Sequence, residues 1–312
     1  MEPIIDVIMP VYNHAPFLAQ AIESIVLQQT KYKFRLLVGE DCSKDNSRDI
    51  LRQYAVQYPD IIVPVYHEQN QGATGNSRIL LSLVTAKYIG ICEGDDFWTD
   101  MRKIEKQVDF LEANPGFSMC FSDVGILDET GTGRMNQYPP LAKDEFTIED
   151  IVTAGYCFIP TATLIYRNNL PWPLPDFYLN AASGDIAMHL LIADKGKGKY
   201  LREKTAVYRH HAGGMTKSEE HIRTGDDKEF LLYEQANEYF GGKYDAVFRR
   251  RLLEMAKVKL VYGSRNMKGI AKLKYVLGNT RNYFKYSNRI NIKEVVYYTT
   301  LLFFPSLLKK KK

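Results

Sequence analysis

Acidic and amide side chains gather where several apolar segments of the sequence end. EDCSKD at residues 40–45 follows one such segment, NQG at 70–72 another, and EGDD at 93–96 a third. A single residue suffices to cap a helix, so capping within residues 45–47 explains only part of this pattern. Adjacent carboxylates also repel each other unless a cation lies beside them. The pattern therefore predicts a site for a divalent cation with oxygen ligands.

Two common phosphate-binding motifs are absent from the sequence. No GxGxxG follows the first apolar segment, where Pro10, Tyr12 and Asn13 stand instead, and no GxxxxGK[ST] occurs anywhere. The GKG at residues 196–198 follows a predicted helix, which is the wrong context for a phosphate-binding turn. Dinucleotide and P-loop chemistry are therefore poor interpretations.

The hydrophobic pattern supplies a scaffold for these residues. Four apolar runs, at 4–9, 34–38, 61–65 and 88–92, are each followed by a stretch with helical spacing of apolar residues. Such alternation predicts an α/β fold with a mostly parallel sheet and helices on both faces. Ligands of these sheets bind at the carboxyl ends of the strands, where the acidic and amide residues stand.

The alternation weakens after residue 121. Further strands are predicted at 117–121, 161–166 and 200–208, and helices at 148–153, 185–193, 219–240 and 244–290. The sequence thus predicts two parts: a first domain, residues 1–216, and a basic helical C-terminal extension, residues 217–312.

The motifs together resemble glycosyltransferase family 2, whose members are inverting enzymes with a GT-A (Rossmann-like) fold. The resemblance covers residues 3–216 and rests on PVYN, EDCSKD in place of a DDxSxD turn, NQG, and EGDDFW in place of a DxD-type metal motif. Glu93 is typical of an EGDD-W subgroup of bacterial polysaccharide-type transferases. The resemblance implies transfer from a nucleotide-sugar, by default a UDP-sugar, to a hydroxyl of a glycan or polyprenyl-linked glycan in cell-surface polysaccharide synthesis.

The resemblance also implies roles for individual side chains. Asp41 would bind the nucleotide base, Asp95 would lie near the ribose, and Asp96 would bind Mn²⁺ or Mg²⁺. His211, within a segment similar to the family's YRxH, would complete the metal shell, and a nitrogen ligand favours manganese. A departing diphosphate needs such a cation more than it needs a proton. The alternative for His211 is an ordinary loop histidine.

Inverting transfer requires a base that takes the proton from the acceptor hydroxyl. Asp185, at the start of an apolar helix, stands where the family places its catalytic aspartate. Helix capping is the alternative for this residue.

The remaining predicted nucleotide-binding residues carry weaker signals. They are Pro10, Tyr12, Asn13, Asn70 and Arg78. The first three also fit plain turn chemistry, and Arg78 also fits a solvated helix face.

The net charge of +4 is the sum of two parts of the chain that carry opposite net charges. From Lys243 to Lys312 there are 18 Lys or Arg and 3 Asp or Glu, so this segment carries +15 and residues 1–242 carry −11. The uncharged stretch 295–308 has 14 residues, too few to span a bilayer. It predicts an interfacial segment beside lysines that contact an anionic membrane, although a solvated helical cap is the alternative.

Localisation follows from the same patterns. The sequence contains no run of 18 apolar residues, and its start, MEPIID, lacks the features of a secretory signal. Four cysteines without CxxC spacing indicate reduced thiols. We therefore expect a cytoplasmic protein, peripheral on the inner face of the cell membrane.

Two other functions compete with the enzyme. Aromatic and basic residues interleave in the C-terminal part, as in single-strand nucleic-acid binding, but the acidic body argues against a nucleic-acid partner. A non-catalytic nucleotide-sugar-binding protein of the same fold is the second. The presence of both Asp96 and Asp185 speaks against it.

Overall fold

The computed structural model describes residues 2–131, 141–181, 183–214, 227–260, 269–287 and 293. The chain forms two compact units, one of Met1–Leu174 with Gly184–Gly214 and the other of Pro175–Ser183 with Met215–Lys312. The predicted domain boundary at residue 216 falls outside the described residues and stays a prediction.

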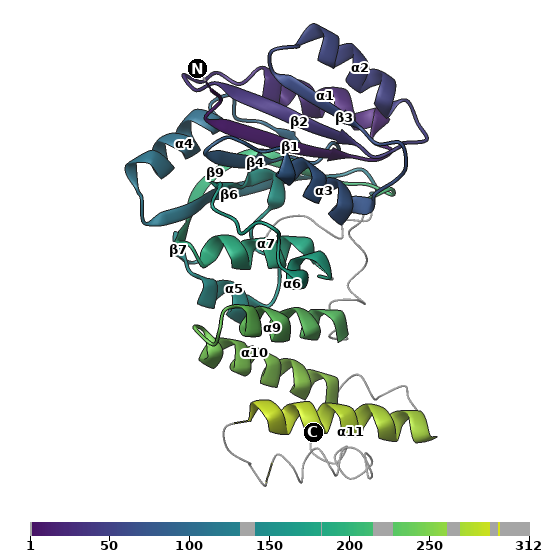
Figure 1. Ribbon diagram of the computed structural model, residues 1–312, viewed down its shortest axis with the longest axis vertical. Helices are drawn as coiled ribbons and strands as arrows, with labels where there is room; N and C mark the ends of the chain where they lie inside the picture. Colours follow the sequence, from purple (N-terminus) through teal and green to yellow (C-terminus); the bar gives the residue numbers. More distant parts are fainter. Residues whose placement is uncertain are drawn as a thin grey trace. The chain divides into compact units, whose positions relative to one another are not determined.

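The first unit is built on one mixed sheet (Figure 1). The order of its strands is β3-β2-β1-β4-β8-β6-β9-β5, and β7 pairs with β9. The strands described are β1 (Ile5–Val11), β2 (Phe34–Glu40), β3 (Ile62–Tyr66), β4 (Tyr88–Ile91), β5 (Phe97–Trp98), β6 (Phe117–Asp128), β7 (Glu145–Phe146), β8 (Ile165–Arg167) and β9 (Lys197–His210).

The first four predicted strands are parallel, as expected. β1 pairs with β2 and β4, and β2 pairs with β3, all in parallel register. Their carboxyl ends therefore meet at one edge of the sheet. β6 and β9 are also parallel, whereas β8, β5 and β7 pair antiparallel with their neighbours.

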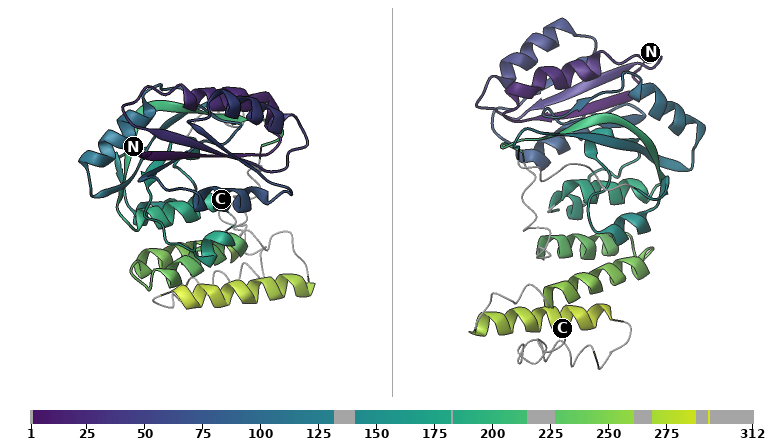
Figure 2. Two further views of the ribbon diagram at one scale, coloured as in Figure 1. Left: turned by 45° about the horizontal axis from the view of Figure 1, so that its top comes forward. Right: turned by 180° about the vertical axis from the view of Figure 1, so that it is seen from behind.

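Helices cover both faces of this sheet (Figures 1 and 2). Side chains alternate along a strand, and β2 shows the result. Val38 packs in one buried cluster with Leu18 and Ile22, whereas the next residue, Gly39, faces Leu80 on the opposite side. The helices of this unit are α1 (Ala15–Val26), α2 (Ser47–Gln57), α3 (Gly72–Ser82), α4 (Lys103–Ala113), α5 (Ile148–Ala154) and α7 (Gly184–Ala193).

The strand predicted at 161–166 is partly wrong. Its first residues form a short 3-10 turn, η1 (Thr161–Thr163), and the strand itself is only Ile165–Arg167. Pro160 starts this turn, because the Thr163 amide donates to the Pro160 carbonyl at 2.9 Å. The two-residue strands β5 and β7 were not predicted, since two residues carry no periodicity.

The second unit is helical in its described parts. It contains α6 (Asp176–Leu179), α9 (Asp227–Tyr239), α10 (Asp245–Val258) and α11 (Gly269–Tyr286). Gly241 and Gly242, both with positive φ, follow α9 and separate it from α10. Helical structure predicted for 244–290 is present in α10 and α11, and residues 261–268 between them lie outside the described residues.

No helix in the described part of the chain is both long and apolar enough to cross a bilayer. The predicted interfacial segment, 295–308, lies outside the described residues.

Candidate active site

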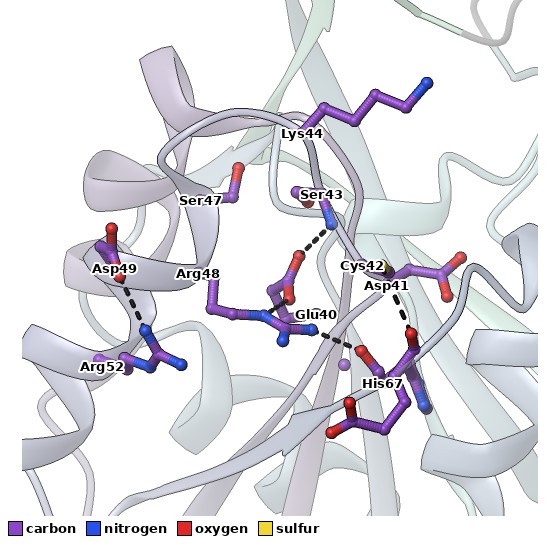
Figure 3. A network of polar contacts seen from close by, with 12 residues as sticks. Glu40, Asp41, Cys42, Ser43, Lys44, Ser47, Arg48, Asp49, Arg52 and His67 are labelled. Atoms are coloured by element: carbon purple, nitrogen blue, oxygen red, sulfur yellow. Dashed lines mark hydrogen bonds and ion pairs between the residues drawn. The ribbon is translucent and has the colours of Figure 1, made fainter.

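The turn after β2 is built around a buried carboxylate (Figure 3). Glu40 is fully buried, and its Oε1 accepts a hydrogen bond from the Ser43 amide at 2.6 Å. Its Oε2 accepts a hydrogen bond from Arg48, which also donates to the His67 carbonyl. Glu40 therefore shapes the turn, and its neighbour carries the predicted binding role.

That neighbour, Asp41, joins the ends of β2 and β3. Its Oδ1 accepts a hydrogen bond from the Gln71 amide at 2.6 Å, and the Asn70 side chain donates to the Asp41 carbonyl at 3.0 Å. Cys42 follows with φ of 57°, a left-handed conformation that non-glycine residues adopt mainly at special sites. The structure thus brings the predicted residues Asp41 and Asn70 together.

The segment after β1 contacts both neighbouring turns. Asn13, with φ of 56°, donates from its amide to the Ser43 hydroxyl at 3.0 Å and accepts from the Lys44 amide at 2.8 Å. The Pro10 carbonyl accepts a hydrogen bond from the Gly94 amide at 3.1 Å. PVYN therefore connects the predicted base site to the EGDD turn.

Two predicted nucleotide-binding residues are exposed. Tyr12, within the segment that follows β1, is 39% exposed. Arg78 is exposed on α3, and its side chain makes no ion pair or hydrogen bond with the rest of the described chain. The structure does not bring Arg78 into contact with the other site residues.

The EGDD turn needs its glycine. A Cβ on Gly94 would lie 2.8 Å from Val11 Cγ2 and 2.9 Å from His14 Nδ1. These distances are too short for carbon contacts, so only glycine lets the turn lie this close to the end of β1. The close approach sets Asp95 beside His14.

Asp95 lies between two imidazoles. Its Oδ2 is 3.1 Å from His211 Nε2 and 3.5 Å from His14 Nε2, and its side chain is 19% exposed. Burial lowers the pKa of His14, while the nearby Asp95 charge acts to raise it. The His14 Nδ1 atom is buried without a hydrogen-bond partner among the described residues.

Asp96 points to the interior, where Arg209 holds it. Its Oδ1 accepts a hydrogen bond from the Arg209 amide at 2.8 Å, and the Arg209 Nε donates to the Asp95 carbonyl at 2.9 Å. Asp96 is only 4% exposed. Burial, followed by the charge of Asp95, raises the pKa of Asp96 to about 8, and Arg209 opposes this. The two adjacent aspartates therefore have different surroundings.

Glu93 connects this pair of aspartates to Asp185. Burial, then the charges of Asp96, Asp185 and Asp95, raises the pKa of Glu93 well above its usual range. Its Oε2 atom is buried and has no partner in the described part of the chain. The structure therefore brings Asp185 within electrostatic range of the EGDD turn, although the two are about 90 residues apart in sequence.

Asp185 lies in the first turn of α7, whose following residues Ile186–Ala193 are all buried. Its side chain is accessible to solvent, yet it lies deep among protein atoms. Burial raises the pKa of Asp185, and the side chain of Thr161 acts to lower it.

Three residues of this site were not assigned a role from the sequence. His14 follows PVYN directly, and Arg209 lies in the segment that resembles YRxH, so motif neighbours were the available signal. Thr161 had no such signal. It enters the site only because its side chain acts to lower the pKa of Asp185.

The residues present fit a divalent cation only in part. No group of three or more His, Cys, Asp or Glu side chains in the described residues is arranged to hold a metal. Asp95 and His211 do offer an oxygen and a nitrogen donor 3.1 Å apart. Such a pair suits a cation whose other positions are filled by a diphosphate and water.

Comparison with known proteins decides the family. The family model for glycosyl transferase family 2 matches residues 6–170, more than half of the chain. The chain belongs to glycosyl transferase family 2. This result confirms the family resemblance and the expectation of a glycosyltransferase domain.

Relatives of this family 2 protein match about two thirds of its length. An uncharacterized glycosyltransferase of Nostoc sp. is 31% identical over 213 residues, 66% of this chain and 65% of the relative. An uncharacterized protein of Mycobacterium bovis is 30% identical over 205 residues, 65% of this chain. The match spans only 58% of that mycobacterial relative.

Solved structures confirm the fold of this glycosyl transferase family 2 chain. S. aureus TarS 1-349 has a TM-score of 0.62 at 13% identity and covers 91% of this chain and 81% of its own. The same TarS fragment in complex with UDP-GlcNAc has a TM-score of 0.61 at 14% identity, covering 90% and 81%. A mannosyltransferase of Pyrobaculum calidifontis, solved with GDP-Man and Mn²⁺, has a TM-score of 0.50 at 15% identity, covering 99% and 83%. The α/β GT-A architecture predicted from the sequence is therefore confirmed.

Proposed function

We propose that this protein is an inverting, metal-dependent glycosyltransferase that moves a sugar from a nucleotide-sugar to an acceptor hydroxyl. One observation carries the proposal: three carboxylates that can serve different purposes, Asp41, Asp95 and Asp185, lie at connected turns of one site. Membership in glycosyl transferase family 2 supports the reaction class.

The donor in this proposal is a UDP-sugar. TarS, which has the same fold, was solved with UDP and with UDP-GlcNAc. Asp41, Asn70 and the segment Pro10–Asn13 would surround the base and ribose, and Asn13 already contacts the turn that carries Asp41. Arg78 would reach a phosphate only after a change of side-chain conformation, because it is exposed on α3.

The proposed cation is Mn²⁺ or Mg²⁺. Asp96, the ligand predicted from the sequence, would contribute its Oδ2, which has no hydrogen-bond partner among the described residues. Asp95, which the sequence placed near the ribose, is proposed to face the cation as well, because it lies beside His211, the other predicted ligand. When bound, the cation would stabilise the negative charge that develops on the departing diphosphate. The imidazole of His211 favours Mn²⁺ over Mg²⁺.

Asp185 is the proposed general base. It would accept the proton of the acceptor hydroxyl as that oxygen attacks the anomeric carbon, with inversion of configuration. Its raised pKa makes it a stronger base than an ordinary carboxylate, and its accessible side chain leaves room for an acceptor.

The acceptor in this proposal is a glycan or polyprenyl-linked glycan of cell-surface polysaccharide synthesis at the cytoplasmic face of the membrane. The basic residues from 243 onward, with the uncharged segment 295–308, would hold the enzyme against anionic lipid. This part of the proposal rests on the sequence.

A thermal-shift screen tests the proposed donor. We expect one UDP-sugar with Mn²⁺ to raise the melting temperature more than GDP-, ADP- or TDP-sugars do, because binding to the folded state stabilises it by mass action. Slow hydrolysis of the same donor would then show that the site is catalytic. Absence of any shift across the panel would contradict a nucleotide-sugar site.

A further inference from the structure

Asp41 is hydrogen-bonded within the protein through all but one of its polar atoms. Its amide donates to the Val11 carbonyl at 2.9 Å, and its carbonyl accepts from the Asn70 side chain at 3.0 Å. Its Oδ1 accepts from the Gln71 amide at 2.6 Å. The remaining atom, Oδ2, has no hydrogen-bond partner among the described residues, and it is open to solvent although the whole residue is only 2% exposed. The turn after β2 therefore presents a single acceptor atom to a ligand.

The contact with Gln71 decides which oxygen of Asp41 is presented. A backbone amide only donates hydrogen bonds, so the atom that faces it must be an acceptor. The carboxylate of Asp41 cannot turn without breaking this 2.6 Å hydrogen bond. Oδ1 is thereby fixed on the protein side, and Oδ2 is fixed on the ligand side.

Buried contacts behind the site hold α3 against the end of β2. Asn76, on α3, is 2% exposed and donates to the Gly39 carbonyl at 2.8 Å. Its Oδ1 lies 3.0 Å from His67 Nε2, and His67 is also buried. Gln71 directly precedes α3, and Gly39 lies two residues before Asp41. The Gln71 amide and the Asp41 carboxylate are therefore held together by more than their own hydrogen bond.

One acceptor atom suits a base with one N–H at the centre of its hydrogen-bonding edge. Uracil has this edge, because its N3–H lies between two carbonyl oxygens. Guanine presents two adjacent donors, N1–H and N2–H, which a carboxylate meets with both of its oxygens, and here Gln71 already occupies one. The ring nitrogen at the same edge of cytosine or adenine is an acceptor, which a carboxylate oxygen repels. The geometry therefore favours uracil.

We propose that Gln71 determines the base specificity of the donor site: its amide fixes Asp41 Oδ1, so that Oδ2 alone contacts the base and selects uracil through its N3–H. This inference rests on the proposed function, in which Asp41 binds the base of a nucleotide-sugar. Gln71 acts through its backbone. Its side chain is exposed and donates to the Gln69 carbonyl at 2.9 Å, so the side chain is not needed for this role.

Asp41→Asn should reverse the preference of the site. The Gln71 amide must still face an oxygen, so the new side-chain NH₂ group takes the place of Oδ2. A donor at this place suits N3 of cytosine and opposes N3–H of uracil. Calorimetry with Mn²⁺ should show UDP binding weakened about 10–100-fold and CDP binding strengthened. Equal loss of affinity for UDP and CDP would overturn the inference.

Two substitutions at position 71 test whether the amide is responsible. Gln71→Pro removes the amide, and the φ of Gln71, −89°, is near the range of proline. Gln71→Ala keeps the amide and is the matched control, so its UDP dissociation constant should stay within about twofold of the wild type. Asp41→Asn should prefer CDP when combined with Gln71→Ala. Combined with Gln71→Pro, it should bind UDP and CDP within about threefold of each other, because the amide group is then free to turn. A preference for CDP that survives Gln71→Pro would overturn the role of Gln71.

A modified nucleotide tests the same contact in the wild-type protein, and this measurement holds even if Gln71→Pro does not fold. N3-methyl-UDP has a methyl group in place of the N3 hydrogen. Its affinity should be about 10–100-fold lower than that of UDP, because the hydrogen bond to Asp41 Oδ2 is lost. Equal affinity of the wild type for UDP and N3-methyl-UDP would show that N3–H is not the group that Asp41 contacts, and would overturn the inference.

A nucleotide panel separates this inference from the proposed function. Wild-type protein with Mn²⁺ is titrated with UDP, CDP, GDP and ADP, and UDP should bind most tightly. Preference for GDP, CDP or ADP would leave a nucleotide-sugar enzyme standing but would overturn base selection by Asp41 and Gln71. A wild type that binds none of the four nucleotides would overturn the proposed function itself.

Discussion

The carboxylates of this site share a charge but differ in their surroundings. Asp95 is partly exposed between two imidazoles, Asp96 is buried against the Arg209 amide, and Asp185 is accessible at the start of α7. The surroundings of a carboxylate decide whether it serves as ligand, hydrogen-bond acceptor or base. At the scale of single residues, the site is therefore specified by what surrounds each acid.

Asp185→Asn should separate catalysis from binding. An amide cannot accept the acceptor's proton, so we expect turnover to fall by about 10²–10⁴-fold. Affinity for UDP with Mn²⁺ should stay within about threefold, measured by calorimetry, and Asp60→Asn, an exposed change, is the control. Near-normal turnover in Asp185→Asn would rule out its role as base.

Asp95→Asn and Asp96→Asn test the proposed cation site. Each removes a negative charge, so Mn²⁺ should no longer strengthen UDP binding, a loss of about tenfold or more. Calorimetry with and without EDTA measures this effect directly. If only Asp95→Asn shows the loss, then Asp96 has a structural role and the cation binds to Asp95 and His211 alone.

At the scale of elements, buried polar contacts fix the turns that carry the site. The turn after β2 depends on the pair between Glu40, which is fully buried, and Arg48, whose side chain is 26% exposed. The turn η1 depends on Lys103 and its neighbours. In both cases a polar side chain fixes the backbone of a turn through hydrogen bonds.

Arg48→Met should destabilise the first unit. It leaves the buried Glu40 carboxylate without its partner, so we expect a loss of about 2–4 kcal/mol in the free energy of unfolding. Arg52→Met is the matched control on the same helix, because the Arg52–Asp49 pair is exposed and should contribute less than about 0.5 kcal/mol. Urea denaturation of both variants measures the difference. Equal stability of the two variants would show that the buried pair contributes no more to the free energy of unfolding than the exposed pair does.

Lys103 should make stability depend on pH in the alkaline range. Burial lowers the pKa of Lys103 from 10.5 to about 7 in the folded protein, so the unfolded chain binds more protons between these values. The free energy of unfolding of the wild type should therefore rise, relative to Lys103→Met, as the pH increases from about 7.5 to 9.5. The slope should approach about 1.4 kcal/mol per pH unit. If the free energies of unfolding of the two proteins change in parallel with pH, the pKa of Lys103 is not lowered in the folded protein.

At the scale of the whole molecule, charge is distributed unevenly. Residues 1–242 carry −11 and residues 243–312 carry +15. An acidic body suits a cation-dependent site, and a basic C-terminal part suits an anionic surface. The two parts of the chain are thus expected to bind different partners.

Membrane binding should depend on the terminal lysines. Replacing residues 309–312, all lysine, with Gln should lower recovery on anionic liposomes, at about 1 kcal/mol per charge, and the loss should shrink in high salt. Four Lys→Gln changes at exposed positions of the first unit, Lys33, Lys195, Lys197 and Lys204, give the same change in net charge as a control. Equal flotation of both variants would defeat the idea of a basic membrane contact.

The sequence correctly predicted the repeated strand–helix pattern, the parallel sheet edge and the motif residues at that edge. Local periodicity suffices for this, because each strand and helix must bury one apolar face. The sequence also correctly placed Asp41 and Asn70 at one edge of the sheet, since neighbouring parallel strands end at the same edge.

Which residues surround these motifs became known only from the folded chain. Glu40 bonds to Arg48, Asp95 to His211, and Asp96 to the Arg209 amide, and in the last two pairs the partners are 116 and 113 residues apart. Hydrogen bonds of this kind depend on distances and angles in space, which periodicity does not encode. The sequence therefore identified the chemical groups of the site, and the position of β9 beside the EGDD turn set their surroundings.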